Sequence, residues 1–251
     1  MLISMSDLVK DYGVNPRVIA HVGAHKGEEH QQYLKLNPKS IYWFEANPDQ
    51  VTFLNERFQD DGTQHVVHGA IWDTDGETLD FKITNNTLSS SLFNLGEHSR
   101  KYPDIVNERE VSVKTLRLDT FFTDKQLPDF INLDIQGAEL HALKGASEIL
   151  HSVSHIYTEV SHIELYLGAP LAGEMDLYLT KLGFKKVMTR NLPRDGWGDV
   201  LYINTNLVSL PKSRIAARLL GNFIHWAGNQ IYSVRLAVHR IRKSKAGKSN
   251  E

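Results

Sequence analysis

The stretch Val18-Ile19-Ala20-His21-Val22-Gly23-Ala24-His25-Lys26-Gly27-Glu28-Glu29 decides the fold of this chain. Its first five residues form a short, mostly apolar run, which predicts one buried strand. Gly23 and Gly27 follow, and residues 28–36 continue at helical spacing. Strand, glycine turn and helix are the first half of a nucleotide-binding unit, in which glycine lets the backbone approach a ligand. The same pattern also serves packing alone in many α/β proteins, so the next strand has to decide between the two interpretations.

That next strand, Ser40–Glu45, ends in a carboxylate. Glu45 stands 18 residues after Gly27. An acidic residue at this place can accept hydrogen bonds from both hydroxyls of a ribose, in the crevice where open α/β sheets bind ligands. A glutamate that ends a strand is otherwise often simply solvated, and its distance from the glycine turn is what favours the ribose. We therefore expect a ligand with a ribose to bind here.

The composition fits one sizeable α/β domain with an appendage. The chain has 251 residues, of which 41% are hydrophobic and 23% are charged. It contains no cysteine, which excludes disulfides, thiolate catalysis and cysteine-ligated zinc. The first residues lack the basic segment and apolar core of a signal peptide, and no run of 18 uncharged apolar residues predicts a membrane-spanning helix. We expect a cytoplasmic protein.

Charge divides the chain at about residue 210. Nine of its 28 lysines and arginines lie from Pro211 onward, where Glu251 is the one acidic residue. The preceding 210 residues therefore hold 19 basic and 29 acidic side chains. An acidic body with a basic tail implies two parts with different partners. We predict a main domain over 1–210 and a basic tail over 211–251.

Strands and helices alternate through the main domain. Beyond the two strands above, the periodicity predicts strands over 64–72, 79–84, 111–116, 130–135, 155–160, 185–189 and 199–204. Helices are predicted over 7–12 with Ser6 as the cap, over 48–58, over 138–150 and over 174–182. The polar segment 85–107 predicts a long loop, which in a compact domain is functional or mobile. The alternation predicts an α/β fold with a single doubly wound sheet.

Polar residues stand at the ends of four of the predicted strands: His21, Glu45, Asp134 and Glu159. The carboxyl ends of parallel strands share one edge of a sheet, so these side chains can surround one crevice. Asp134 is the most informative, because Gly137 and Glu139 follow it in an Asp-x-x-Gly-x-Glu pattern. The alternative is structural: Asp134 caps the next helix and Glu139 interacts favourably with the helix dipole.

A series of short motifs follows one order along the main domain. They are His-Val-Gly-Ala-His-Lys-Gly-Glu at 21–28, Phe-Glu-Ala-Asn-Pro at 44–48, Gly-Ala-Ile-Trp at 69–72, Ser-Ser-Ser-Leu at 89–92, Val-Lys-Thr-Leu-Arg-Leu-Asp at 113–119, Asn-Leu-Asp-Ile-Gln-Gly-Ala-Glu-Leu at 132–140, Leu-Lys-Gly-Ala at 143–146 and Thr-Glu at 158–159. In this order they resemble the FkbM family of S-adenosylmethionine-dependent methyltransferases. The resemblance covers residues 18–204, and the motifs at 132–146 are its most specific part.

The resemblance implies a class I methyltransferase fold, a doubly wound, mostly parallel, Rossmann-like sheet of seven strands with the last strand antiparallel. It implies S-adenosyl-L-methionine as the cofactor, with Glu45 on the ribose and Asp134 facing the sulfonium. Ala70 and Ile71 would lie against the adenine. The full set of cofactor-binding residues expected on this basis is His21, Gly23, Ala24, His25, Gly27, Glu45, Ala46, Ala70, Ile71, Ser91 and Asp134. Family members commonly carry an acidic residue where this chain has His21.

Transfer to a hydroxyl requires a nucleophile held in line behind the methyl group and a base that takes its proton. The candidates for the base are Asp134, Glu139, Glu159 and His162, and a histidine titrates most conveniently near neutral pH. We expect Asp134, Glu159 and His162 to be catalytic, although His162 also fits a surface histidine. An alternative is that Asp134 and Glu159 bind Mg²⁺ or Ca²⁺, which would hold the acceptor oxygen and lower its pKa. A divalent cation is not expected.

The predicted acceptor is a hydroxyl of a small molecule or glycan, bound between segments 85–107 and 161–173. Base-amino methyltransferases of the same superfamily usually carry an Asn/Asp-Pro-Pro-aromatic turn that can stack a flipped base, whereas this chain has Asp-Ile-Gln-Gly. An RNA acceptor is therefore disfavoured. A nicotinamide enzyme is disfavoured because the first turn lacks Gly-x-Gly-x-x-Gly. The remaining alternative is a scaffolding module that binds an adenosyl group without turnover, which His21 favours.

The tail is predicted to be a long amphipathic helix. Its apolar stripe contains Ile215, Leu219, Phe223, Trp226, Ile231, Val234, Val238 and Ile241. Aromatic residues on one face and basic residues on the other suit an anionic membrane, so one expectation is peripheral contact through 214–245 with the inner membrane surface. The alternatives are packing on its own domain, packing on a second copy in a homodimer, or salt-dependent binding to RNA.

Overall fold

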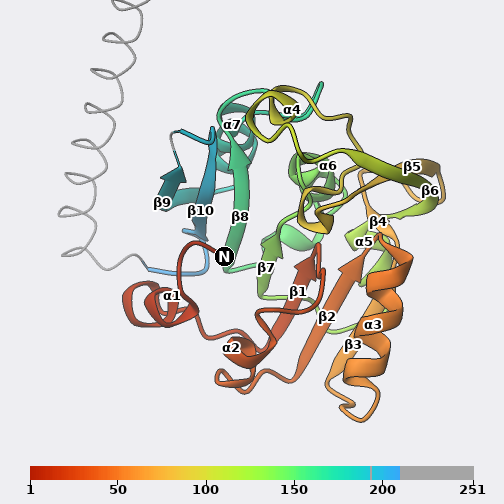
Figure 1. Ribbon diagram of the computed structural model, residues 1–251. Coiled ribbons are helices and arrows are strands. Elements are labelled where there is room, and N and C mark those ends of the chain that lie inside the picture. Colours follow the sequence, from red (N-terminus) through yellow and green to blue (C-terminus); the bar gives the residue numbers. More distant parts are fainter. Residues whose placement is uncertain (193, 210–251) are drawn as a thin grey trace, which may run out of the picture. The chain divides into compact units, whose positions relative to one another are not determined.

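The centre of the structure is a seven-stranded sheet, seen in the computed structural model of Figure 1, which describes residues 1–192 and 194–209. In spatial order its strands are β3 (Gln64–His68), β2 (Ser40–Glu45), β1 (Val18–Val22), β7 (Phe130–Leu133), β8 (His155–Ser161), β10 (Trp197–Asn204) and β9 (Phe184–Leu192). The five strands from β3 to β8 pair in parallel. The prediction of an α/β fold with a mostly parallel seven-stranded sheet is confirmed.

Strand β10 runs antiparallel to both of its neighbours, β8 and β9. A short connection between β9 and β10 can join only antiparallel strands, whereas the parallel strands need longer crossovers. The central strands β1 and β7 are buried at every position. Burial on both faces is expected where helices cover a parallel sheet. Polar chemistry in this part of the fold therefore gathers where the strands end.

A second, three-stranded sheet corrects the prediction of a single sheet. It contains β4 (Ala70–Ile71), β6 (Asn107–Leu116) and β5 (Thr78–Thr84), in that order. The predicted continuous strand over 64–72 is wrong, because the chain leaves the main sheet at Gly69. A Cβ at Gly69 would lie 2.7 Å from a methyl carbon of Leu116, so a larger residue there would require the Leu116 side chain to shift.

The main helices are α1 (Met5–Tyr12), α2 (His30–Leu34), α3 (Pro48–Phe58), α5 (Leu118–Phe121), α6 (Glu139–Lys144) and α7 (Ala172–Lys181). Helix α1 is capped by Ser4, whose hydroxyl accepts the Asp7 N–H, and not by Ser6. The helix predicted over 28–36 is confined to α2. The helix predicted over 138–150 is divided into α6 and a short turn of helix, η2 (Ile149–His151). Helix α6 ends before Gly145, where a Cβ would lie 1.9 Å from the Trp72 carbonyl oxygen.

The segment 85–107 is not the plain loop predicted from its composition. It contains a short turn of helix, η1 (Thr87–Ser89), and helix α4 (Glu97–Lys101). In Figure 1, α4 and the β5–β6 pair lie on the side of the main sheet toward which β1 and β2 point. Helix α4 and the β5–β6 pair, which lie in the chain between β4 and β7, are therefore near the carboxyl edge of the main sheet, where ligands bind in folds of this kind.

Apolar side chains from the sheet and from the helices that cover it form the main core, which includes Phe44, Leu133, Leu143 and Ile156. Within residues 1–192 and 194–209, no helix is both long enough and apolar enough to cross a membrane. The predicted tail over 211–251, with its helix over 214–245, lies outside the described residues.

Candidate functional site

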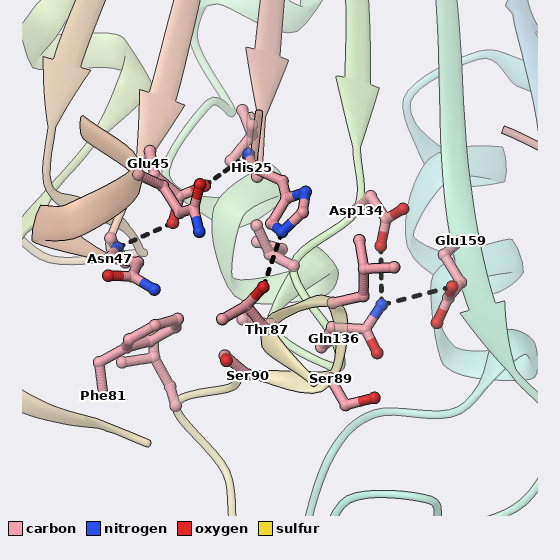
Figure 2. A pocket seen from close by; sticks show the side chains of 18 of the residues that line it. His25, Glu45, Asn47, Phe81, Thr87, Ser89, Ser90, Asp134, Gln136 and Glu159 are labelled. Atoms are coloured by element: carbon pink, nitrogen blue, oxygen red, sulfur yellow. Dashed lines mark hydrogen bonds between the residues drawn. The ribbon is translucent and has the colours of Figure 1, made fainter. Parts of the chain in front are cut away.

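A cavity of about 460 Å³ lies at the carboxyl edge of the sheet. Its wall is made by the turns that follow β1, β2 and β7 and by segment 86–92, among others. Figure 2 shows Glu45 and His25 at one end and Asp134, Gln136 and Glu159 at the other. The volume is within the range of small-molecule sites. Three of the four polar strand-end residues, Glu45, Asp134 and Glu159, line this one cavity.

Glu45 is held by the main chain. One of its carboxylate oxygens accepts the His25 N–H at 2.7 Å, and the other accepts the Asn47 N–H at 2.8 Å. Burial raises the pKa of Glu45, and these two N–H donors oppose the rise because they stabilise the ionised form. A carboxylate has about four acceptor positions, so the two N–H bonds leave capacity for further donors such as ligand hydroxyls.

The glycine turn contacts both ends of the cavity. Gly23 has a φ of +88°, and a Cβ there would lie 1.9 Å from the Asp134 carbonyl oxygen. The next turn residue, His25, also has a positive φ, of +46°. Its ring bonds Glu28 at 2.6 Å and the Thr87 hydroxyl at 2.8 Å. The turn therefore fixes both the floor of the cavity and the position of η1 above it.

At the opposite end, the Gln136 side chain lies between two carboxylates (Figure 2). Its Nε2 donates to Asp134 Oδ1 at 2.8 Å and to Glu159 Oε2 at 3.4 Å. Asp134 is open to the cavity although protein atoms surround its carboxyl group, and this desolvation raises its pKa to about 6. Desolvation and then the nearby Asp134 raise the pKa of Glu159 well above its ordinary value. Two acids with raised pKa values in one cavity suit proton transfer near neutral pH.

Glu139 holds the loop between β7 and α6 and does not line the cavity. Its carboxylate accepts the Ile135 N–H at 3.0 Å and the Gly137 N–H at 3.1 Å. The side chain is buried, and this desolvation raises its pKa to about 7. The second acid of the Asp-x-x-Gly-x-Glu pattern thus bonds backward to its own loop, which sets the position of Gln136.

Several predicted site residues line the cavity: Gly23, His25, Glu45, Ala46, Ala70, Ile71, Asp134 and Glu159. Others line it that the sequence did not single out: Asn47, Phe81, Thr87, Ser89, His98, Tyr102 and Trp197. Four of these residues belong to segment 85–107, which the sequence predicts on the acceptor side: Thr87, Ser89, His98 and Tyr102. Trp197 carried no signal, because only the pairing of β10 with β8 brings it to the cavity.

The other predicted residues lie away from the cavity lining: His21, Ala24, Gly27, Ser91 and His162. His21 precedes the cavity-lining Val22, and successive strand residues face opposite sides. It is buried against Tyr33, whose hydroxyl lies 3.0 Å from its ring, and burial lowers its pKa. The Ser91 hydroxyl donates to the Gln136 carbonyl oxygen at 2.7 Å. The His162 ring bonds the Asn191 side chain at the surface.

The described part of the chain, 1–192 and 194–209, contains no group of three or more histidine, aspartate or glutamate side chains arranged to hold a metal ion. Asp134 and Glu159, the pair named as metal ligands in the alternative above, are instead joined by the amide of Gln136.

Comparison with known proteins gives a consistent result. Residues 21–186 match the family described as Methyltransferase FkbM domain. The 2-O-methyltransferase NoeI of Sinorhizobium fredii is 32% identical over 201 residues, which is 76% of this chain and 80% of that protein. The crystal structure of Methyltransferase FkbM from Methylobacillus flagellatus KT superposes with a TM-score of 0.50 at 16% identity. That match covers 74% of this chain but 43% of the other, and at this identity it concerns the fold alone.

Proposed function

Since the chain belongs to the FkbM methyltransferase family and is a methyltransferase, we propose that it transfers a methyl group from S-adenosyl-L-methionine to a hydroxyl of a small molecule or glycan. The observation that carries this proposal is the cavity with Glu45 at one end and Asp134 at the other. Ligands of doubly wound sheets bind at this edge. The relative NoeI is, by its name, a 2-O-methyltransferase, which supports an oxygen acceptor.

The residues at the Glu45 end fit the adenosyl part of this cofactor. The Glu45 carboxylate keeps acceptor capacity for the two ribose hydroxyls after binding two N–H groups. Ala70, Ile71 and Phe81 supply an apolar wall beside it that suits a purine ring. Gly23 leaves the turn after β1 without a side chain, so a ligand can approach its backbone.

The residues at the Asp134 end fit the reaction itself. S-adenosylmethionine, when bound, supplies a methyl group that its sulfonium has already activated. The protein then has to orient a hydroxyl and take its proton. Asp134, with a pKa of about 6, is largely ionised at neutral pH and can accept that proton. Glu159, beside it, can hold the acceptor through a second hydrogen bond.

The cavity lining favours an uncharged acceptor over a nucleic acid. Among the described residues that line the cavity there is no lysine or arginine, while three carboxylates face it. Phosphate groups bind mainly through basic side chains, so an RNA acceptor is disfavoured. The rings of Tyr102 and Trp197 also line the cavity. Planar rings beside carboxylates suit a neutral ring that carries hydroxyls.

The experiment that tests this function combines binding and transfer. We expect the purified protein to bind S-adenosylmethionine and S-adenosylhomocysteine in calorimetry, and to transfer a labelled methyl group to a member of a panel of neutral glycans and ring alcohols. A thermal-shift comparison with NAD provides the control, because a ligand that binds only the native protein raises its melting temperature. Stabilisation by NAD alone would overturn the proposal. Cofactor binding without transfer to any acceptor would point to the scaffolding module instead.

A further inference from the structure

We propose that Gln136 is a positioning residue that holds Asp134 and Glu159 together at the methyl-transfer end of the cavity, with Tyr166 fixing the orientation of its amide. This inference rests on the proposed function and deepens it, because it concerns how the site is kept ready for the acceptor. The Gln136 side chain makes three hydrogen bonds, two of which Figure 2 shows.

The backbone of Gln136 is held in an uncommon conformation. Its φ is +52°, in the left-handed region that residues other than glycine seldom adopt. Its carbonyl oxygen accepts the Ser91 hydroxyl at 2.7 Å. The N–H groups of the residues on either side, Ile135 and Gly137, donate to the buried Glu139 carboxylate. A strained residue persists only where its surroundings hold it in this way, and such residues concentrate at functional sites.

The side-chain amide has its orientation decided by its partners. Tyr166 donates its hydroxyl proton to Gln136 Oε1 at 2.6 Å. The two hydrogens on Nε2 then point to Asp134 at 2.8 Å and to Glu159 at 3.4 Å. An ionised carboxylate only accepts hydrogen bonds, so a flipped amide would place oxygen against oxygen. The buried Tyr166 hydroxyl therefore keeps the donating end of the amide toward the two acids.

This arrangement counters the repulsion between two acids that share a cavity. Without a donor between them, Asp134 and Glu159 would separate or hold their protons more strongly, because the amide opposes the rise in the pKa of each acid. The amide satisfies one oxygen of Asp134, and among the described residues the other oxygen, Oδ2, receives no hydrogen bond. Oδ2 is therefore the oxygen that remains for the acceptor hydroxyl. A neutral amide is suited to this task, because a glutamate at position 136 would add a third carboxylate.

The test uses Gln136→Met, which removes both ends of the amide, and Gln136→Glu, which adds a charge. The first readout is the ratio of the Kd values for S-adenosylhomocysteine and S-adenosylmethionine in calorimetry. Only the second ligand carries the sulfonium charge, so this ratio reports the carboxylates without requiring an acceptor. We expect Gln136→Met to lower the preference for S-adenosylmethionine by about three- to tenfold and Gln136→Glu to raise it. Both variants should lower kcat by about 10- to 100-fold, with KM changed far less.

Tyr166→Phe supplies a milder and independent variant, because it leaves Gln136 in place and removes the hydroxyl that lies 2.6 Å from Gln136 Oε1 and 3.3 Å from the Ser89 carbonyl oxygen. We expect a change in the same direction as Gln136→Met but smaller. The matched control is Tyr178→Phe, since the Tyr178 hydroxyl donates to the Leu143 carbonyl oxygen and not to Gln136. If Gln136→Met does not fold, Tyr166→Phe still decides the matter.

The outcomes separate this inference from the proposed function. A parent protein that binds neither ligand overturns both. A parent that binds and methylates, with Gln136→Met and Tyr166→Phe keeping the parent's Kd ratio and kcat, overturns only the role of Gln136. A ratio that changes equally in Tyr178→Phe would attribute the effect to a general loss of packing and would also overturn it.

Discussion

The two ends of the cavity hold a carboxylate in different ways. Glu45 is bound by main-chain N–H groups of the turns that follow β1 and β2, whereas Asp134 is bound by a side-chain amide. Main-chain donors are placed by the strand–turn geometry, whatever the side chains are. A side-chain donor depends on a further series of contacts, which here continues to Tyr166. If the proposed function holds, the Glu45 end should set the affinity for the cofactor and the Asp134 end the rate of methyl transfer.

The largest effect that would sharpen this contrast is expected from Asp134→Asn, which removes the charge and keeps the size. If Asp134 takes the proton of the acceptor, kcat should fall by about 10²- to 10⁴-fold while the Kd of S-adenosylhomocysteine changes little. Because only the ionised form accepts a proton and the pKa of Asp134 is raised to about 6, kcat/KM of the parent should rise with pH through this value. Initial rates from acid to neutral pH check both points.

His162→Ala is the control for this measurement, because His162 bonds Asn191 at the surface and does not line the cavity. We expect its kcat to stay within about twofold of the parent. A loss as large as that of Asp134→Asn would instead make His162 the base and would remove the contrast between the two ends.

Gly23 packs against the main chain at the Asp134 end, and Gly23→Ala should disrupt this close approach. Its Cβ would lie 1.9 Å from the Asp134 carbonyl oxygen, on a residue with a φ of +88°. We expect a loss of about 2–4 kcal/mol in the free energy of unfolding, measured by chemical denaturation. Gly173→Ala is the matched control in α7, where a Cβ meets nothing within 4 Å, and it should be neutral or stabilising by up to about 1 kcal/mol. Equal effects at both positions would contradict the close approach.

Glu45→Ala tests the affinity end. If the Glu45 carboxylate accepts hydrogen bonds from the ribose hydroxyls as proposed, this variant removes them, and it leaves two N–H groups without their partner. We expect S-adenosylmethionine to bind about 30- to 100-fold more weakly in calorimetry, with the Kd ratio between the two cofactor forms unchanged. Glu56→Ala, on the exposed side of α3, should bind like the parent. A Glu45→Ala variant with the parent's affinity would remove the adenosyl group from this end of the cavity.

The smallest effect concerns Glu139, which holds the loop between β7 and α6 at the Asp134 end of the cavity. Burial raises its pKa from 4.5 to about 7. Between these values the folded protein keeps a proton that the unfolded chain has released, so this group makes the parent less stable as the pH rises. Glu139→Gln does not titrate, so it does not lose stability in this way as the pH rises. The difference in unfolding free energy between the variant and the parent should therefore shift in favour of the variant by on the order of 1–3 kcal/mol from pH 4.5 to 7. Parallel stability curves for the two proteins would show that Glu139 does not titrate in this range.

The positions of the two main carboxylates of the cavity, Glu45 and Asp134, could be predicted from local patterns. The position of Glu45 follows from an apolar strand and a count of residues from the glycine turn, and Asp134 follows from the same logic on β7. His21 did not follow, because the pattern places a residue along a strand but its side chain alternates between faces. The second sheet also escaped prediction, since β5 and β6 show the same alternation whichever sheet they join.

The sequence by itself determined most of the strands and helices in their chain order, the edge of the sheet where the site lies, and the family. These depend on periodicity, spacing and motifs, all of which are local. Only the tertiary structure decided that Gln136 lies between two carboxylates, that Tyr166 orients it, and that Trp197 reaches the cavity. Except for the contact between Gln136 and Asp134, these contacts pair residues far apart in the chain, and the close packing that joins them leaves no periodic trace in either segment.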